Sequence, residues 1–521
     1  MSLEPWRALL TYPGFSGSLW MSLWTGFAAT VISFAIAIGF AAAWRGTRVF
    51  GLLQRLVAPL LSVPHAAVAL GMLFLLAPSG WVLRMGSPWA TGFTRPPDWA
   101  TAPDPYGLVF VLALVVKETP FLFLMTVAAL NQVREREIVT TARTLGYGPT
   151  TAWLKCVFPL VYPQLRLPVY AVLAFSLSVI DVALVLAPAT SPPLGVLILR
   201  WFNDPDLSYQ FVAAAGAVAQ LVVVAGGIAI WRLGEWFVAA LGRRWASAGD
   251  RDAFDRPVSV FSFAGTGLLW VSGAGSLLGM AIWSMARQWR FPDALPSEWS
   301  LANWMRRADT MIELGGTTVT VGLASAGIAL FLAVACLEHE KRDGLRPTAR
   351  ALWLLYTPLL VPQVAFLFGA QVLLVAAGID GGWTALIWAH LLFVLPYVFL
   401  SLSDPFRSLD ERYRTTAQCL GLRPAAVFWR VTAPLLLRPI LVAFAVGFAV
   451  SVSQYLPTVF AGGGRLETLT TEAVALAGGG DRRLIGMLVF AQSILPFLAF
   501  LFAAGLPAWA FRNRLGLRGL A

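Results

Sequence analysis

Two stretches of this sequence decide its organisation, because each repeats the other. Residues 140–160 read TTARTLGYGPTTAWLKCVFPL, and residues 415–435 read TTAQCLGLRPAAVFWRVTAPL. They lie 275 positions apart and share eight of 21 residues: Thr140/Thr415, Thr141/Thr416, Ala142/Ala417, Leu145/Leu420, Gly146/Gly421, Pro149/Pro424, Pro159/Pro434 and Leu160/Leu435. Another pair of segments, VPHAAVALG at 63–71 and VPQVAFLFG at 361–369, matches at an offset of 298. These matches indicate an internal duplication, because polar, Gly and Pro residues rarely coincide in register by chance.

The composition around this duplication is that of a membrane protein. Of 521 residues, 58% are hydrophobic and 12% are charged, and the mean hydropathy is +0.72. A soluble domain carries roughly 25% charged residues. The composition therefore excludes a water-soluble enzyme, a disordered chain and a nucleic-acid-binding protein, and it makes membrane lipid the surrounding medium. The three cysteines predict no disulfide framework.

Eleven apolar segments are long enough to cross a bilayer, which takes about 20 residues. The expected spans are 17–44, 56–78, 107–130, 167–187, 209–232, 263–287, 313–337, 351–377, 383–402, 439–460 and 484–511. The predicted fold class is therefore an all-α polytopic membrane protein. The duplication divides it into a first lobe at 1–250 with five spans and a second lobe at 251–521 with six. Six spans separate the two repeated loops, so the lobes are expected to cross the membrane in the same direction.

Basic residues predict the orientation. One alternating set of connections, together with the C-terminal tail, holds 26 Lys and Arg residues, and the other set holds 11. Connections rich in Lys and Arg remain in the cytoplasm. We therefore expect both repeated loops and the C-terminus on the cytoplasmic face of a bacterial inner membrane, and the N-terminus in the periplasm.

The beginning of the first lobe differs from that of the second. Ser300-Leu301-x-x-Trp304 follows the expected span 263–287, whereas the matching Ser2-Leu3-x-x-Trp6 has no span before it. The repeat therefore predicts that the first lobe has lost one helix, or that this helix is encoded upstream of the assigned start.

Each repeated loop reads as two short helices joined at a glycine. In the first copy, 137–145 predicts a helix, Gly146 a left-handed stop, and Pro149 the first turn of a second helix. Pro159 and Pro163 are expected to mark re-entry into the membrane. Residues 412–438 repeat this pattern. Two equivalent helix–Gly–helix elbows on one face predict two docking elements for a partner with two equivalent grooves.

The elbows resemble the "EAA" loop of binding-protein-dependent ABC importer permeases. The residues that carry this resemblance are Thr140, Thr141, Ala142, Gly146, Cys156, Phe158 and Pro159, and in the second copy Thr415, Thr416, Ala417, Gly421, Val431, Ala433 and Pro434. Both copies have Thr where the family pattern begins with Glu. Acidic residues lie upstream instead: Glu135, Glu137, Asp410 and Glu411. With two lobes in one chain, the sequence resembles the fused ferric-iron and thiamine importer permeases, and most of all a thiamine-permease-like branch.

The resemblance implies two tandem MetI-like permease lobes that form a translocation path. It also implies coupling to two separate ATPase subunits inside and to a solute-binding protein outside. The sequence itself predicts no ATPase in this chain, because none of its three lysines lies in a Gly-Lys-Ser/Thr phosphate-binding loop. No bound cofactor is expected, and ATP and Mg²⁺ would belong to the partner ATPase. No His, Cys and acidic cluster has metal-ligand spacing.

Polar residues inside expected spans are candidates for the substrate path, because they are costly in hydrocarbon. They are His65, Gln363, Ser176, Ser178, Asp181, Ser451, Ser453 and Gln454. His65 and Gln363 are expected to face each other or to form ordinary interhelical hydrogen bonds. At most one Ser of each pair can face a pore, because residues i and i+2 lie on different faces of a helix. Asp181 is the best candidate for contact with a cation.

Lys117 and Glu118 lie inside a span beside Pro120 and point about 100° apart, so they need separate partners or a water-filled cavity. A gate and a structural kink are equally consistent with this segment. His390 is expected to be a core histidine.

Two other classes of protein remain as alternatives. A proton-coupled secondary transporter can also arise by parallel duplication, with Asp181 and the Lys117–Glu118 pair carrying protons. A membrane enzyme or scaffold is the second alternative, although the chain lacks a large outer loop with paired carboxylates. Dependence of transport on ATP or on a proton gradient distinguishes the first alternative from an ABC permease.

Overall fold

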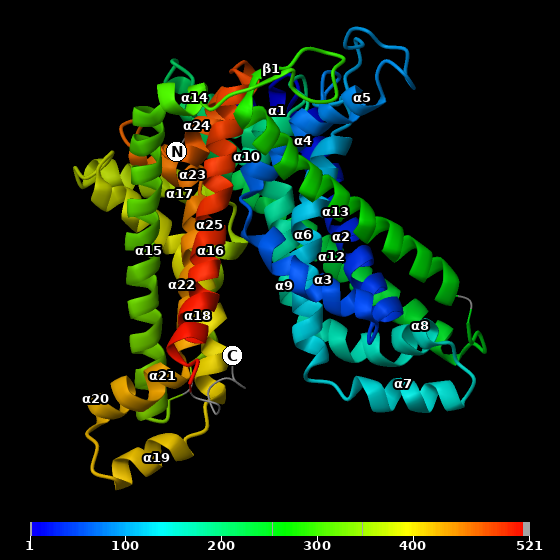
Figure 1. Cartoon of the computed structure of the whole chain (residues 1–521), viewed down its shortest axis with the longest axis vertical. Coiled ribbons are helices and arrows are strands. Elements are labelled where there is room, and N and C mark those ends of the chain that lie inside the picture. Colours follow the sequence, from blue (N-terminus) through cyan, green and yellow to red (C-terminus); the bar gives the residue numbers. More distant parts are fainter. Residues whose placement is uncertain (1–2, 253, 346, 514–521) are drawn as a thin grey trace.

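The computed structural model describes residues 3–252, 254–345 and 347–513, and helices make up most of this part of the chain (Figure 1). Nine helices of the described residues are long and apolar enough to cross a membrane, and two bent helix pairs bring the number to at most eleven. An all-α polytopic fold with up to eleven spans is therefore confirmed.

The elements of the first half are α1 (Glu4–Thr11), α2 (Phe15–Trp44), α3 (Arg48–Ser62), α4 (His65–Leu76), α5 (Trp81–Gly86), α6 (Leu108–Leu130), α7 (Glu135–Thr144), α8 (Pro149–Ala152), the π-helical turn η1 (Trp153–Val157), α9 (Phe158–Ser178), α10 (Asp181–Leu186), α11 (Leu194–Phe202) and α12 (Ser208–Ser247).

The elements of the second half are α13 (Asp255–Met285), β1 (Ala286–Gln288), β2 (Glu298–Trp299), α14 (Ala302–Arg306), α15 (Ala308–Arg342), α16 (Ala349–Leu360), α17 (Gln363–Ala376), α18 (Trp383–Ser408), α19 (Arg412–Cys419), α20 (Pro424–Val427), the π-helical turn η2 (Phe428–Thr432), α21 (Ala433–Leu435), α22 (Leu437–Val452), α23 (Leu456–Gly462), α24 (Leu469–Ala475), the 3₁₀ turn η3 (Leu476–Gly478) and α25 (Arg482–Ala510). The short strands β1 and β2 pair antiparallel.

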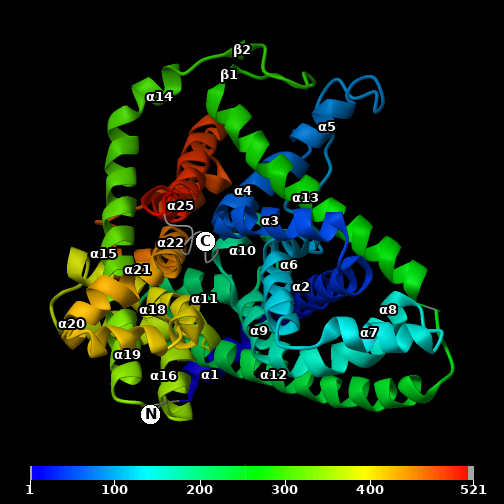
Figure 2. The ribbon, with the colours of Figure 1, turned by 60° about the horizontal axis from the view of Figure 1, so that its bottom comes forward.

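The two halves meet at one end of the molecule and diverge toward the other (Figure 1). Where they meet, α4 contacts α24 and α25, and α17 contacts α11 and α12. Helix α13 belongs to the second half by sequence, yet it packs on α2 and α4 of the first. At the diverging end, α7 and α8 lie on one side and α19 and α20 on the other, which Figure 2 shows from below. The expected lobe boundary at residue 250 stays a prediction.

Several expected spans are broken rather than continuous. The segment 56–78 divides at Val63 and Pro64 between α3 and α4, and the matching α16 and α17 meet at an angle of 101°. Proline explains this position, because it lacks an N–H and disfavours helix in the residue before it. The expected spans 167–187 and 439–460 end early, at Ser178 and Val452, and each continues as a short separate helix.

The expectation that Pro159 and Pro163 mark re-entry into the membrane stays a prediction, and neither proline interrupts the helix of the first half. Helix α9 runs through both prolines, and a single helical segment extends from Pro149 to Ser178. In the second half the corresponding segment bends by 76° between Leu435 and Leu437. Each π-helical turn ends two residues before a proline, Pro159 or Pro434. A π turn widens the helix, and we attribute it to the ring and the missing N–H of that proline.

The duplication is visible in matching hydrogen bonds. Ser22 of α2 accepts a hydrogen bond from the Leu194 N–H at the start of α11, at 2.8 Å. Thr318 of α15 accepts one from the Leu469 N–H at the start of α24, at 3.0 Å. Helix termini leave N–H groups without intrahelical partners, so each hydroxyl supports the start of a short inserted helix in its own half.

The C-terminal ends of α9 and α22, where the expected spans break, are also supported by polar side chains. In the first half, Gln220 of α12 donates to the Leu177 carbonyl at 3.0 Å. In the second half, Thr470 donates to the Val452 carbonyl, and Gln492 of α25 donates to Thr470 at 2.7 Å. Both glutamines are fully buried. Matching breaks therefore have matching polar supports, which sequence reasoning did not anticipate.

Candidate coupling elbows and translocation path

The first elbow has the geometry that its sequence predicts. Helix α7 ends before Gly146, whose φ is +87°, and α8 begins at Pro149. In the second elbow α19 precedes Gly421, whose φ is +84°, and α20 begins at Pro424. The left-handed backbone expected at both glycines is confirmed. Their role in coupling to a partner stays a prediction.

The outer faces of the two elbows match residue by residue. Thr140 and Thr141 are exposed, as are Thr415 and Thr416. Large apolar side chains follow at the end of each first helix, where Leu145 is 62% exposed and Leu420 is 79% exposed. An exposed leucine therefore recurs at the equivalent point of both elbows.

The alanines of the repeat point inward. Ala142 and Ala417 are both buried. Ala142 lies seven residues after the buried Glu135, and a spacing of seven returns to the same helical face. The exposed threonines and leucines, rather than the alanines, therefore form the free surface of each elbow.

An ion pair whose elbow residue is buried ties each elbow to the C-terminal end of a long helix of its half, α2 or α15. In the first half, the Glu135 carboxylate of α7 accepts from Arg45 Nε and from Trp153 Nε1, both at 2.9 Å. In the second half, Arg414 of α19 makes two hydrogen bonds to Glu338 of α15, at 2.8 and 3.0 Å. The elbow contributes the acidic residue of the pair in the first half and the basic residue in the second half. Glu135 is buried in this contact, so it is a structural anchor and not an exposed substitute for the missing Glu of the EAA pattern.

The connection between the halves also packs on the first elbow. Asp255, the first residue of α13, accepts from the Thr151 N–H at 2.7 Å and from its hydroxyl at 2.9 Å. Lys155 donates to the carbonyls of Ala248 and Asp250. The Gly148 N–H donates to the Arg251 carbonyl at 2.7 Å. The first elbow is therefore held from two sides.

Three ionisable side chains of the first half lie near one another. His65 Nε2, at the start of α4, lies 3.3 Å from Glu118 Oε1 of α6. Asp181, at the start of α10, is within electrostatic reach of His65. His65 also packs against the Phe175 ring at 4.8 Å. His65 thus contacts a carboxylate of its own half, and the facing of His65 and Gln363 stays a prediction.

Two tyrosines of the second half lie near these acids. Tyr455 is within electrostatic reach of Asp181, and Tyr397 is within reach of Glu118. The acids belong to the first half and the tyrosines to the second. Helices α4 and α10, which begin with His65 and Asp181, contact α24 of the second half, so the group borders the seam between the halves. Sequence reasoning missed both tyrosines, because a single Tyr in an apolar span carries no pattern.

Lys117 and Glu118 have separate partners, as their directions on the helix predicted. Lys117 Nζ donates to the carbonyls of Leu61 and Val63, the last residues before Pro64. These carbonyls belong to the break between α3 and α4. The ammonium group of Lys117 therefore stabilises that break.

The two serines of each pair have different surroundings, as expected for residues on different helix faces. Ser178 and Ser453 are half-buried and donate to carbonyls of their own helices, those of Ala174 and Ala449. Ser451 is buried and lies 2.8 Å from His390 Nδ1, whose Nε2 lies 3.0 Å from Thr458. His390 is thereby confirmed as a core histidine.

Ser176 and Gln454 are also buried, and within the described part of the chain neither the Ser176 hydroxyl nor the Gln454 carbonyl oxygen has a hydrogen-bond partner. They remain candidates for contact with a solute. The same described residues contain no group of three or more His, Cys, Asp and Glu side chains suited to a metal ion.

Two parallel helical lobes, each with a matching elbow at the same end and polar groups between the lobes, define a duplicated membrane permease. Residues 35–246 and 342–505 match the family model described as "Binding-protein-dependent transport system inner membrane component". The chain belongs to this family of ABC transporter permeases. It is a multi-pass inner-membrane component without catalytic activity of its own, and the family works with ATPase and binding-protein partners.

Individual relatives agree with this assignment. The chain is 32% identical to the inner membrane ABC transporter permease protein YnjC of Escherichia coli K12, over 99% of this chain and 93% of that protein. Shorter matches include the spermidine/putrescine permease PotC of Haemophilus influenzae, 23% identical over 34% of this chain and 70% of that protein. The molybdenum permease ModB of Mycobacterium tuberculosis is 32% identical over 28% of this chain and 58% of its own length.

Proposed function

We propose that this chain forms the whole translocation path of an ABC importer and that its two elbows dock two cytoplasmic ATPase subunits. The observation that carries the proposal is the pair of matching elbows with exposed Leu145 and Leu420. One chain with two such elbows suits one pair of ATPases. ATP and Mg²⁺ then belong to these subunits, and a periplasmic binding protein delivers the solute at the opposite end.

The anchored elbows suggest how ATPase closure moves the lobes. Each elbow is tied by an ion pair to a helix of 30 residues or more, α2 or α15, that continues to the end where the lobes meet. A rigid helix transmits a displacement along its length. Bringing the elbows together on ATP binding would therefore rotate the lobes and open the path toward the periplasm.

The polar group between the lobes favours a cationic solute. Two carboxylates, Glu118 and Asp181, lie there with the rings of Phe175 and Tyr455. Carboxylates and aromatic faces both attract cations. Spermidine and putrescine, which the name of PotC includes, are cationic amines. The resemblance to thiamine and ferric-iron permeases agrees with this class, and we propose a small cation such as a thiamine-like molecule, an amine or ferric iron.

Reconstitution tests the coupling. The purified chain, its ATPase subunits and its binding protein are placed in vesicles, and solute uptake is measured with ATP or with a proton gradient. We expect uptake only with ATP, and loss of ATPase binding in Leu145→Asp and Leu420→Asp. Leu207→Asp is the control, because Leu207 is also exposed but lies between α11 and α12, away from the elbows. Uptake driven by a proton gradient alone would establish the secondary-transporter alternative.

The solute class has its own test. Uptake of labelled thiamine, putrescine, ferric iron and molybdate is compared in the wild type and in Glu118→Gln. We expect a cation to be transported, with a half-saturating concentration at least about tenfold higher in the variant, because one lost charge contact is worth about 1.4 kcal/mol or more. Transport of molybdate alone would contradict the cationic class.

A further inference from the structure

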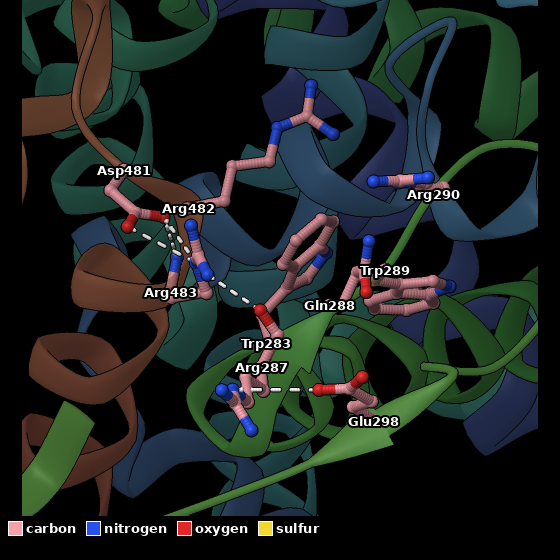
Figure 3. A pocket seen from close by; sticks show the side chains of 9 residues that line it. All are labelled: Trp283, Arg287, Gln288, Trp289, Arg290, Glu298, Asp481, Arg482 and Arg483. Atoms are coloured by element: carbon pink, nitrogen blue, oxygen red, sulfur yellow. Dashed lines mark hydrogen bonds and ion pairs between the residues drawn. The ribbon is translucent and has the colours of Figure 1, made fainter. Parts of the chain in front are cut away.

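A basic pocket lies at the end of the molecule opposite the elbows. It has a volume of about 630 Å³, and its walls include Trp283, Arg287, Arg290, Glu298, Asp481 and Arg483 (Figure 3). These residues come from the end of α13, from β1, β2 and the connection between them, and from the start of α25 and the residue before it. Four arginines and two acids line the pocket, so its lining carries a net charge of +2.

Two arginines brace the walls of the pocket: Arg482 lines it, and Arg84 contacts three of its lining residues. Arg84 is 4% exposed and donates to the carbonyls of Ser79 and Arg290, at 2.9 and 2.8 Å. Its guanidinium also lies over the rings of Trp283 and Trp289. Arg482 donates to the Ser79 hydroxyl at 2.6 Å. These two arginines are held by carbonyls, a hydroxyl and rings, and they join residues 79–84 of the first half to the second half.

The rim of the pocket consists of more exposed arginines. Arg287 pairs with Glu298 at 3.5 Å, and Arg483 pairs with Asp481 at 3.0 Å. The Gln288 side-chain oxygen accepts hydrogen bonds from the Arg290 guanidinium at 2.8 Å, in the amide orientation that gives both its oxygen and its nitrogen a partner. Exposed pairs of this kind contribute about 0–1 kcal/mol. A guest carboxylate can therefore replace Glu298 or Asp481 at little cost.

Resting on the proposed function, we propose that this pocket receives a carboxylate-bearing loop of the solute-binding protein. Three features select this occupant. The pocket faces away from the elbows, it is polar and large enough for several side chains, and guanidinium groups bind carboxylates in bidentate geometry. Because Arg482 joins the wall of the pocket to Ser79 of the first half, a loop seated there lies beside the seam where the lobes meet.

The test uses the complete transporter, with its ATPase subunits, in nanodiscs of phosphatidylcholine. ATP hydrolysis is measured against the concentration of purified binding protein. We expect Arg287→Glu/Arg290→Glu to raise the half-stimulating concentration about tenfold or more, because charge reversal repels the guest. Basal hydrolysis without binding protein should not change. Arg306→Glu, an exposed change on α14 outside the pocket, should stay within about twofold of the wild type.

A second variant works in the opposite direction. Glu298→Gln removes the pocket's own competing carboxylate, so it should lower the half-stimulating concentration about two- to fivefold. Damage to the fold would not produce tighter binding. The same half-stimulating concentration in all these proteins would overturn the docking site. So would an effect of the arginine changes that appears only in nanodiscs with anionic lipid, because the pocket would then hold a lipid headgroup.

Failure of the proposed function would look different. The wild-type complex itself would then hydrolyse ATP at one rate with and without binding protein, and the docking site would be overturned with it.

Discussion

Gly146 and Gly421 require the same left-handed backbone, but their surroundings differ. A Cβ at Gly146 would lie 3.0 Å from the Arg251 guanidinium, whereas a Cβ at Gly421 would meet nothing within 4 Å. The energetic cost of replacing Gly421 with a larger residue therefore comes from the left-handed backbone alone. Position 421 isolates the contribution of the turn to coupling.

We expect Gly421→Val to reduce ATP-driven uptake by about tenfold or more, because a β-branched residue with positive φ costs about 1–2 kcal/mol or more. Gly421→Asn should keep at least about half of the uptake, since Asn tolerates this region. Uptake and the amount of protein in the membrane are measured together. Equal uptake in Val and Asn variants at equal abundance would exclude a requirement for the left-handed turn.

At the scale of the element, the sequence predicts the elbows better than the helix breaks. Gly and Pro at fixed spacing specify each elbow, because few other residues adopt the backbone that the turn needs. The breaks after Ser178 and Val452 were missed, because the polar residues beside them, such as Asp181 and Gln454, were interpreted as side chains of continuous spans that line a path. They depend on Gln220 and Gln492, which lie on helices far along the chain. Contacts of this range leave no local pattern in a single sequence.

The elbow anchors were also beyond sequence reasoning, and their reversed polarity provides a test. Arg414→Glu places two carboxylates together at a mostly buried site, so we expect a loss of about 3 kcal/mol and weaker ATPase binding. The double variant Arg414→Glu/Glu338→Arg restores an ion pair, with the acid on the elbow and the base on the long helix, as in the first half. ATPase binding is measured by co-purification. A double variant no better than Arg414→Glu would show that the pair itself does not position the elbow.

The buried glutamine of α12 gives a second element-scale prediction. Gln220→Leu leaves the Leu177 carbonyl without its side-chain donor, so we expect a loss of about 1–3 kcal/mol in stability. Thermal unfolding in detergent should show a lower midpoint for this variant. Gln54→Leu, an exposed change on α3, should leave the midpoint nearly unchanged. If both variants unfold at the wild-type temperature, Gln220 does not support the break.

At the scale of the whole molecule, the native cysteines report the orientation. Cys156 and Cys419 are exposed and lie in the two elbows. With the elbows in the cytoplasm, a membrane-impermeant maleimide should label them only after the membrane is opened. A cysteine introduced at the exposed Trp89, in a chain whose native cysteines are replaced, should be labelled in intact spheroplasts. Labelling of Cys156 or Cys419 in intact spheroplasts would reverse the proposed topology.

The same two cysteines can measure the motion that the import mechanism requires. The lobes diverge toward the elbows (Figure 1), so closure of two docked ATPases must bring Cys156 and Cys419 nearer to each other. With Cys336 replaced by Ser, spin labels on these two residues would give the elbow separation by pulsed electron resonance. We expect a shorter distance when the complex is trapped with ATP and vanadate, and no change with ATP when the ATPase subunits are absent. A proton-coupled transporter would instead change this distance with pH and not with ATP. A distance that ignores ATP in the assembled complex would therefore remove the elbows from the coupling mechanism, whatever their resemblance to other permeases.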